Sequence, residues 1–356
     1  MNIKKRILFL ITKSEVGGAQ KYVKEQIDIS VNQFDVFLAT NEVGWLTENI
    51  ADKTMGLLLD KRIESRMAFG YLIKLIKYIK QHQIDLVVCN SANGGLYGRI
   101  AAKLTGASSI YVSHGWSSVY NGGRLTFILN RIERFLGNIS GKTICVSNND
   151  YLTAQRKIGL AEDKLILLKN CIFPVELQLS APSNRRGAGS RLKLLSLARL
   201  AYPKRMDILI EAMSGIDFAE LYLIGLGPDE EEIKKDVYAR RLDNVFLLGE
   251  VKSFNSFADY HAFILISDSE GLPMSALEAM SAGLPLILSN VGGCSEIVVN
   301  PSLLVENSVE DIHRALFELN ENFDSYKLPV KDFFDKNFNL LLNKDKYLNL
   351  YSSLIK

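Results

Sequence analysis

Two glutamates eight residues apart are the side chains best suited to hold a ligand rich in hydroxyl groups. Glu270 follows residues 262–267, an apolar segment that predicts a buried strand, and Pro273 predicts the first position of a helix that carries Glu278. Both carboxylates would then lie at the carboxyl end of a parallel strand, where open α/β sheets bind ligands. Carboxylates accept hydrogen bonds from hydroxyls, and the helix N-terminus offers N–H groups to phosphate. The alternative is that both glutamates are ordinary solvated residues.

The segment around these acids resembles the Glu-x7-Glu signature of the retaining glycosyltransferases of family 4. In that family the second Glu precedes small residues, a Gly-x-Pro and a strand, as residues 279–288 do here. Gly292-Gly293 resembles the Gly-Gly loop that opens the family's next helix, although Ser295 replaces the usual Pro. The resemblance implies the GT-B fold, an α/β architecture of two doubly wound Rossmann-like domains facing across a cleft. The donor-binding residues that it implies in this segment are Glu270, Gly271, Leu272 and Glu278.

Two cations follow the first strand of the predicted second domain. Arg199 and Lys204 lie in residues 198–204, which resemble the family's Gly-Arg-Leu-x-x-x-Lys segment, although Ala198 and Arg205 stand where Gly is usual. Breaking a glycosyl phosphate bond builds negative charge on the leaving diphosphate, and fixed cations stabilise that charge most in the transition state. The resemblance therefore implies that Arg199 and Lys204 bind the donor diphosphate and contribute to catalysis.

Two glycine-containing loops also follow predicted strands. Gly17-Gly18 opens a helix after the first strand, and Gly225-Leu226-Gly227 precedes a Pro near the first turn of another helix. Glycines let a backbone approach a ligand closely, but a plain turn is the alternative at both places. By resemblance to the family, both loops are predicted to bind the donor, the second of them beside the nucleotide.

His114 ends a predicted strand, at the place where the family carries a His near the donor sugar and the acceptor. A purely structural His is the alternative. We expect a polar contact at the reacting centre rather than a general base, because retention in this family is usually described as a front-face substitution in which the leaving phosphate takes the acceptor's proton. The predicted catalytic residues are Glu270, His114, Arg199 and Lys204.

Metal-binding patterns are absent from the sequence, which contains no Asp-x-Asp triplet and no cluster of His, Cys and Glu at metal-ligand spacing. We therefore expect neither a metal nor another cofactor, with the nucleotide sugar acting as a co-substrate. The four cysteines are far apart and form no Cys-x-x-Cys pair, which predicts buried free thiols.

The length of 356 residues suits two domains. Strand-like and helix-like segments alternate, which predicts parallel sheets with helices on both faces. The polar stretch 180–190, rich in Gly and Ser, interrupts this alternation and predicts a surface connection. By resemblance to the GT-B fold, we expect an acceptor-side domain at 1–175, a nucleotide-sugar-binding domain at 176–335 and a final helix at 336–356 that crosses back to the first domain. Strands are predicted at 6–12, 34–40, 85–91, 109–114, 142–147 and 164–169, and then at 192–197, 221–224, 244–248, 262–267 and 284–288.

Charge is distributed unevenly along the chain. Residues 1–175 carry 23 Lys and Arg against 14 Asp and Glu, whereas residues 176–356 carry 19 against 26. A basic first domain predicts contact with an anionic partner such as a membrane surface or a lipid pyrophosphate, and a solvated basic face is the alternative. The amphipathic segments 72–80 and 116–134 are the candidates for lipid contact. Without an apolar run of membrane-spanning length or a signal-peptide pattern, we expect a cytoplasmic protein with peripheral contact at the inner face of the cell membrane.

Together these features predict an enzyme, a retaining and metal-independent glycosyltransferase of the hexosyltransferase class. Its donor would be a nucleotide diphosphate sugar, UDP-linked on family frequency, and its acceptor a glycan or lipid-linked oligosaccharide in bacterial surface polysaccharide synthesis. No nucleic acid is expected as a partner. Two alternatives stay open: a sugar-nucleotide epimerase or phosphorylase of the same fold, and a non-catalytic subunit that binds a sugar nucleotide.

Overall fold

The computed structural model describes residues 4–120, 123–176, 189–251 and 253–355. Contacts within it divide the chain into two compact units. Unit 1 comprises Met1–Asn170 and Leu342–Lys356, and unit 2 comprises Cys171–Leu341. The predicted domain limits were 175 and 336. Residues 180–188 of the predicted connection lie outside the described residues.

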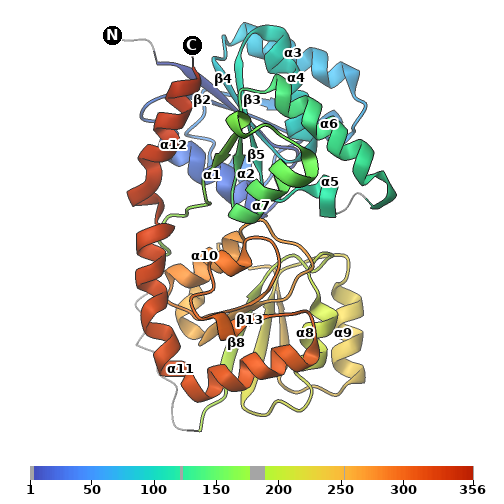
Figure 1. Ribbon diagram of the computed structural model, residues 1–356, viewed down its shortest axis with the longest axis vertical. Helices are drawn as coiled ribbons and strands as arrows, with labels where there is room; N and C mark the ends of the chain where they lie inside the picture. The colour runs from blue at the N-terminus through green and yellow to red at the C-terminus, as the bar shows by residue number, and fades with distance from the viewer. Residues whose placement is uncertain (1–3, 121–122, 177–188, 252, 356) are drawn as a thin grey trace. The chain divides into compact units, whose positions relative to one another are not determined.

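The described part of unit 1 contains a seven-stranded parallel sheet in the order β3-β2-β1-β4-β5-β6-β7, flanked by helices (Figure 1). Its strands are β1 (Arg6–Leu10), β2 (Asp35–Thr40), β3 (Gly56–Leu59), β4 (Leu86–Asn90), β5 (Ser108–Ser113), β6 (Lys142–Cys145) and β7 (Leu165–Leu167). Its helices before the last one are α1 (Gly18–Ser30), α2 (Trp45–Asn49), α3 (Phe69–Gln81), α4 (Ala92–Thr105), α5 (Ser117–Tyr120), α6 (Thr126–Ile139) and α7 (Asn148–Thr153).

The central strands of unit 1 are apolar along nearly their whole length because helices cover both faces of the sheet. Residues 7–10 of β1 and 86–89 of β4 are fully buried. Such continuous apolar runs are what a parallel sheet covered on both sides requires, and they made these strands predictable. β3 was not predicted, because it has four residues and only Leu58 among them is buried. It gives no periodic signal of useful length.

The last helix, α12 (Leu340–Leu354), completes the core of unit 1 with two tyrosines. Tyr351 Oη donates a hydrogen bond to Gln26 Oε1 at 2.9 Å, and Tyr347 Oη donates to the Lys169 carbonyl at 2.7 Å. Both rings are fully buried, and Tyr351 packs edge-on against Phe9 of β1 with ring centroids 6.1 Å apart. The C-terminal segment is therefore part of the same core as the first strand.

Unit 2 contains, in its described residues, a six-stranded parallel sheet in the order β10-β9-β8-β11-β12-β13. Its strands are β8 (Leu192–Leu197), β9 (Ala219–Ile224), β10 (Val245–Gly249), β11 (Ala262–Leu265), β12 (Leu286–Ser289) and β13 (Leu304–Val305). Its helices are α8 (Met206–Ala212), α9 (Glu230–Ala239), α10 (Met274–Ser281) and α11 (Val309–Asn337). The predicted class, two doubly wound α/β units, is confirmed.

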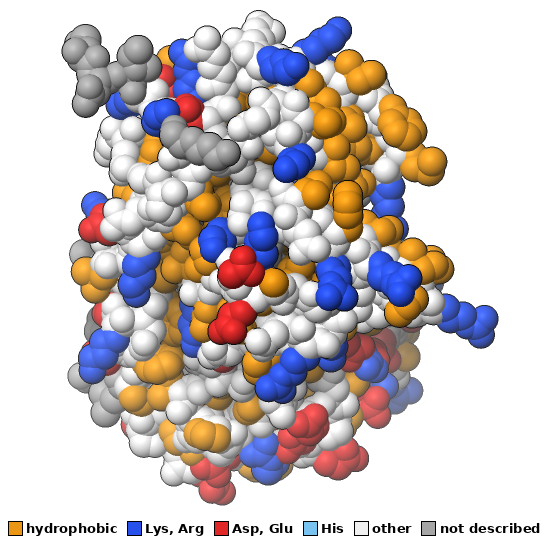
Figure 2. Space-filling view, turned by 45° about the horizontal axis from the view of Figure 1, so that its top comes forward, with side chains coloured by type: hydrophobic (Ala, Val, Ile, Leu, Met, Phe, Trp, Pro, Cys, Tyr) orange, Lys and Arg blue, Asp and Glu red, His pale blue; other side chains and the backbone are white. Residues whose placement is uncertain are grey.

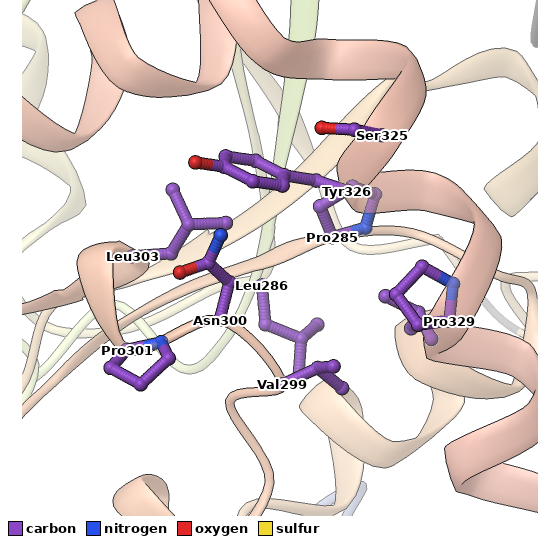
Figure 3. A pocket seen from close by; sticks show the side chains of 10 residues that line it. Pro285, Leu286, Val299, Asn300, Pro301, Leu303, Ser325, Tyr326 and Pro329 are labelled. Atoms are coloured by element: carbon purple, nitrogen blue, oxygen red, sulfur yellow. The ribbon is translucent and has the colours of Figure 1, made fainter.

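A cavity of about 290 Å³ lies in unit 2 beside the second half of α11. The helix has a non-helical residue at Asn322 and Pro329 inside it, and a Pro within a helix removes a backbone hydrogen bond and kinks the chain. Figure 3 shows Pro329 and Tyr326 of α11 together with Pro285 and Leu286, which lead into β12. The cavity is therefore at the amino ends of the strands, whereas α/β sheets bind ligands at the carboxyl ends.

Candidate functional site

The candidate site of unit 2 lies where the strand order of its sheet reverses. β8 has β9 on one side and β11 on the other, so the chain first winds outward to β10 and then continues from β11 in the opposite direction. The loops after β8 and β11 therefore leave the carboxyl edge of the sheet next to each other. The first loop carries Arg199 and Lys204, and the second carries Glu270. The structure thus brings together segments that lie far apart in the sequence.

Backbone hydrogen bonds join these two loops. The Arg205 N–H donates to the Ile266 carbonyl at 2.9 Å, and the Asp268 N–H donates to the Pro203 carbonyl at 2.8 Å. Ser267 lies between the two bonds, is fully buried, and donates from Oγ to the same Pro203 carbonyl at 3.2 Å. Because the buried polar groups are paired across the gap, the two loops are held at a fixed spacing.

Lys204 and Glu270 form an ion pair at this edge, in which Lys204 Nζ donates to Glu270 Oε1. Their side chains are only 17% and 10% exposed, so the pair is largely shielded from water. An ammonium group has three donors and a carboxylate accepts at two oxygens, so each group can form further hydrogen bonds besides the one between them. The arrangement can offer donors to phosphate oxygens and acceptors to sugar hydroxyls.

Gly225 and Gly227 have a packing role beside the loop after β8. A Cβ on Gly225 would lie 1.9 Å from the Ala198 carbonyl oxygen, and a Cβ on Gly227 would lie 1.9 Å from the Leu200 carbonyl oxygen. Between them, the Leu200 N–H donates to the Leu226 carbonyl at 3.0 Å. Any larger residue would push the cation-bearing loop away, which explains both glycines. Their contact with the donor stays a prediction.

The backbone of Glu270 is fixed by the loop that follows β12. Gly292 has φ +55°, and a Cβ there would lie 1.7 Å from the Glu270 carbonyl oxygen. The Gly293 N–H donates to the Gly271 carbonyl at 2.8 Å. The expectation that this glycine pair opens a helix is wrong: only the 3₁₀ turn Cys294–Glu296 follows. This turn contains Ser295 in place of the Pro that would preset a helical φ.

Helix α10 presents Glu278 on its open side. Glu278 and Ser275 are three residues apart, share one side of the helix and are partly exposed, whereas the remaining residues of the helix are buried. Pro273 precedes the helix as its N-cap instead of occupying its first position, a shift of one residue from the prediction. Leu272 is 3% exposed, so its side chain belongs to the core and only its backbone is suited to contact a donor.

The described residues contain no group of three or more His, Cys, Asp or Glu side chains placed to hold a metal ion. The four cysteines are free and buried, as the sequence predicted. Burial raises the pKa of Cys89 to about 12, and burial together with the negative charge of Glu270 raises the pKa of Cys294 well above its ordinary value. These thiols are therefore neutral at neutral pH.

Unit 1 has its own reversal of strand order, between β1 and β4. Gly17 and Gly18 follow β1, and Gly18 begins α1. Ser91 follows β4 with φ 65° and ψ 165°, a region that is almost restricted to glycine. Its Oγ lies 3.1 Å from the Thr12 N–H nitrogen and 2.6 Å from Thr12 Oγ1, which holds the strained residue in place. Because backbone strain of this kind concentrates at functional sites, this edge is a second candidate site.

His114 follows β5 and is oriented by Asn90 at the end of β4. Asn90 Nδ2 donates to the Val88 carbonyl at 3.3 Å, which leaves Asn90 Oδ1 facing His114 Nε2 at 3.0 Å. The hydrogen-bond network therefore assigns the proton to Nε2 and leaves Nδ1 as the acceptor nitrogen. Burial lowers the pKa of His114 to about 4, so the ring is neutral at neutral pH. Tyr22 contacts the ring edge-on, with centroids 4.9 Å apart.

Three residues with a positioning role were not predicted from the sequence: Asn90, Ser91 and Ser267. Asn90 and Ser267 directly follow apolar strand segments, in Cys89-Asn90 and Ile266-Ser267, and Ser91 comes directly after Asn90. In a doubly wound fold, such a residue stands at the carboxyl edge of the sheet. The change from apolar to polar at the end of a strand is the signal that was available for them.

Comparisons with known proteins show the family of the chain. Residues 16–174 match the family described as Glycosyltransferase Family 4, and residues 183–328 match the family described as Glycosyl transferases group 1. The O-antigen biosynthesis glycosyltransferase WbnH of Escherichia coli is 38% identical over 323 residues, which cover 91% of this chain and 92% of that relative. The chain belongs to the GT-B glycosyltransferases.

A more distant relative also matches this glycosyltransferase over nearly the full length. The UDP-Gal:alpha-D-GlcNAc-diphosphoundecaprenol alpha-1,3-galactosyltransferase of Escherichia coli is 26% identical and covers 96% of this chain and 95% of its own. Among solved structures, Anabaena HepE in complex with UDP and glucose has a TM-score of 0.84 at 17% identity, covering 98% of this chain and all of that one. The sucrose-phosphate synthase of Thermosynechococcus elongatus has a TM-score of 0.83 at 16% identity with the same coverage. These two structures show the fold.

Proposed function

We propose that this glycosyltransferase is a retaining hexosyltransferase that moves a sugar from a UDP-sugar to a hydroxyl of a lipid-linked glycan in bacterial surface polysaccharide synthesis. The observation that carries the proposal is the enclosed ion pair of Lys204 and Glu270 at the strand reversal of unit 2. The polysaccharide pathway is supported by WbnH, which is named for O-antigen biosynthesis. The donor is supported by HepE, whose structure has been solved with UDP-glucose.

In the proposed mechanism, the two cations of unit 2 act on the leaving diphosphate. Arg199 binds the phosphates with two parallel hydrogen bonds, and Lys204 adds a point charge. Both interactions strengthen as the glycosyl bond breaks and charge builds on the leaving group, so they lower the barrier as well as bind the donor. Lys204 turns part of its hydrogen-bonding capacity from Glu270 to phosphate when the donor enters.

The two acids bind hydroxyl groups of the same donor. Glu270, relieved of part of its contact with Lys204, accepts hydrogen bonds from the sugar, while Glu278 accepts them from the ribose. The N-terminus of α10, close to both in the sequence, contributes the positive end of its dipole toward the phosphates. Since Arg199, Lys204 and the N-terminus of α10 together supply the positive potential that the leaving group needs, we propose that the reaction requires no metal ion.

His114 is proposed as a polar contact at the reacting centre, with its acceptor nitrogen Nδ1 directed to a hydroxyl of the donor sugar or the acceptor. A neutral ring with a low pKa is a poor general base at neutral pH, because it holds an abstracted proton weakly. The acceptor proton passes instead to the leaving phosphate oxygen on the same face of the sugar. The new bond then forms with retention of the anomeric configuration.

The proposed acceptor determines where the enzyme works. Two relatives, one from Escherichia coli and one from Campylobacter jejuni, are named for transfer to sugars on diphosphoundecaprenol. A similar acceptor here would be embedded in the bilayer, so we propose a cytoplasmic protein that contacts the inner face of the cell membrane peripherally. None of the helices in the described ranges has both the length and the apolar character needed to cross a bilayer.

The test of this proposal is a panel of nucleotide sugars offered with a synthetic diphosphate-linked acceptor sugar. We expect UDP release from one UDP-sugar only when the acceptor is present, and NMR of the product should show the donor's anomeric configuration. Activity should be the same with EDTA. Acceptor-independent conversion of the donor, an inverted product, or activity lost with EDTA and restored by Mn²⁺ would each contradict a part of the proposal.

A further inference from the structure

The structure distinguishes between the two amphipathic segments that the sequence marked for lipid contact. In α3 the residues Tyr71, Leu75 and Ile79 are buried, so the apolar stripe of this helix belongs to the core of unit 1. The segment 123–135, which includes most of α6, differs because it leaves five large apolar side chains exposed by between 44% and 66%. These side chains are Leu125, Phe127, Ile128, Ile132 and Phe135.

The exposed apolar residues of this segment form one stripe. Leu125, Ile128, Ile132 and Phe135 follow one another at intervals of three, four and three residues, which places them on one face of the helix. A stripe with this spacing normally faces a core, but here the side chains project into solvent. We call the exposed side chains of residues 124–135 the α6 surface.

A buried ion pair on the opposite side fixes the rotation of α6. Arg99 of α4 is fully buried, its Nη2 donates to Glu133 Oε2 at 2.9 Å, and its guanidinium lies 4.2 Å from the centre of the Tyr111 ring. Leu136, three residues after Glu133, is also buried. Breaking an enclosed ion pair of this kind is strongly unfavourable. The helix therefore cannot rotate to bury its apolar stripe without losing the ion pair between Arg99 and Glu133.

This pair also makes the outer face of α6 purely basic. Glu133 is the single acid in residues 123–139, and it is turned inward to Arg99. The exposed cations of the α6 surface are Arg124, Arg131 and Arg134. The Arg131 guanidinium carbon lies 4.5 Å from the centre of the Phe127 ring, so a cation and an exposed apolar side chain are in direct contact. Figure 2 shows hydrophobic and Lys or Arg side chains next to one another on the face that it displays.

The neighbouring turn adds further positive charge. Asn130 Nδ2 of α6 donates to the Lys157 carbonyl at 3.4 Å, which joins the helix to residues 154–158. In that turn the side chains of Arg156 and Lys157 are exposed. The turn that contacts α6 therefore adds two exposed cations to those of the helix itself.

We propose that the α6 surface docks on an anionic lipid bilayer. Acyl chains accept the apolar stripe, and lipid phosphates at the interface accept the arginines that border it. A second copy of the chain fits less well, because pairing two α6 surfaces brings arginines against arginines. The proposed function enters only as the reason for membrane docking: docking would hold the enzyme at the bilayer in which a lipid-linked acceptor is embedded.

The test is cosedimentation of the full chain with vesicles, without donor or acceptor. We expect binding to vesicles of equal parts phosphatidylcholine and phosphatidylglycerol, and weaker binding to phosphatidylcholine alone. Replacing both Phe127→Ser and Phe135→Ser should lower the partition coefficient at least about tenfold. Replacing Arg131→Gln with Arg134→Gln should lower it about tenfold on anionic vesicles and little on neutral ones. All four substituted side chains are exposed, so the fold should persist.

A matched control uses the other segment. Phe69→Ser with Ile73→Ser removes two exposed apolar side chains at the start of α3, and this variant should bind vesicles like the wild type. The proposal is overturned if the wild type does not bind, if the α3 variant loses binding and the α6 variants keep it, or if light scattering shows that the α6 substitutions dissociate a dimer instead. Transfer to a short-chain soluble acceptor should be unchanged in the α6 variants, which keeps failure of docking separate from failure of the proposed chemistry.

Discussion

Lys204 and Glu270 are each other's partner in the structure, although in the proposed mechanism they serve different parts of the donor. Their side chains are enclosed by two loops that are joined through Ser267 and backbone hydrogen bonds. In an ion pair with this little exposure, removing one member leaves the other charge without a partner in a site that is shielded from water, which is strongly unfavourable. Single substitutions at this pair therefore report on the site directly.

Glu270→Ala and Lys204→Ala are each expected to lower turnover at least about a hundredfold, since each removes a charge that interacts with the donor in the transition state. Steady-state UDP release measures the rate, and circular dichroism checks the fold. The matched control is Lys234→Gln, a half-exposed cation of α9 that pairs with Glu230 and Glu231 and should keep near-normal activity. Near-normal turnover in both alanine variants would remove the assignment.

His114 should make stability depend on pH. Its pKa falls from the ordinary value of 6.5 to about 4 on burial, so the unfolded chain takes up a proton at a higher pH than the folded chain. The contribution to stability is therefore complete above pH 6.5 and is lost as the pH falls toward 4. Urea unfolding at pH 7 and pH 5 should show a smaller difference for His114→Gln than for the wild type. An unchanged difference would mean that the ring is not buried as described.

The position of each candidate site is set by the carboxyl ends of the strands and by the glycine-containing loops that pack beside those ends. The largely buried strands β1, β4, β8 and β11 could be predicted, because mostly apolar runs between polar turns have few other interpretations. β3 and the two-residue β13 could not, since neither is long enough to show a period. The contact of Lys204 with Glu270 was also beyond sequence reasoning, because the residues are 66 positions apart and meet only when β11 is inserted beside β8.

Gly292→Ala tests whether the loop after β12 positions Glu270. Both Gly292 and Gly215 have a positive φ, of +55° and +77°, so the backbone strain alone should cost about 1 kcal/mol when alanine is placed at either position. Only at Gly292 would the new Cβ collide with the Glu270 carbonyl, whereas Gly215 has open space around it. We expect turnover to fall at least about tenfold in Gly292→Ala and to stay near normal in Gly215→Ala. Equal activities in the two variants would show that the loop has no positioning role.

Across the whole molecule, each unit has its own sheet and its own core, and the chain ends in the unit where it began. The C-terminal segment supplies Tyr347 and Tyr351 to the core of unit 1, so the last residues are as important for that unit as its first strand. The resemblance to the GT-B fold implied such a return of the final helix. The partners Gln26 and Lys169 had no comparable signal, because nothing in the local pattern indicates which distant polar group a tyrosine hydroxyl will meet.

Tyr351→Ala is expected to destabilise unit 1 by about 3–5 kcal/mol, because it leaves a cavity beside Phe9 and removes a partner of Gln26. The control in the same helix is Leu342→Ala, where the side chain is 71% exposed and little should change. Thermal or urea unfolding measures both variants. If the two substitutions have similar small effects, α12 does not belong to the core of unit 1.

We propose that acids and cations at the carboxyl ends of β8 and β11 hold a sugar nucleotide without a metal ion. The most direct measurement is a crystal structure of the protein with a UDP-sugar, grown in the presence of EDTA. We predict the diphosphate on Arg199 and Lys204, the sugar hydroxyls on Glu270 and the ribose on Glu278. A diphosphate bound elsewhere, or one that binds only when Mn²⁺ bridges it to carboxylates, would show that these residues do not bind the donor in this way.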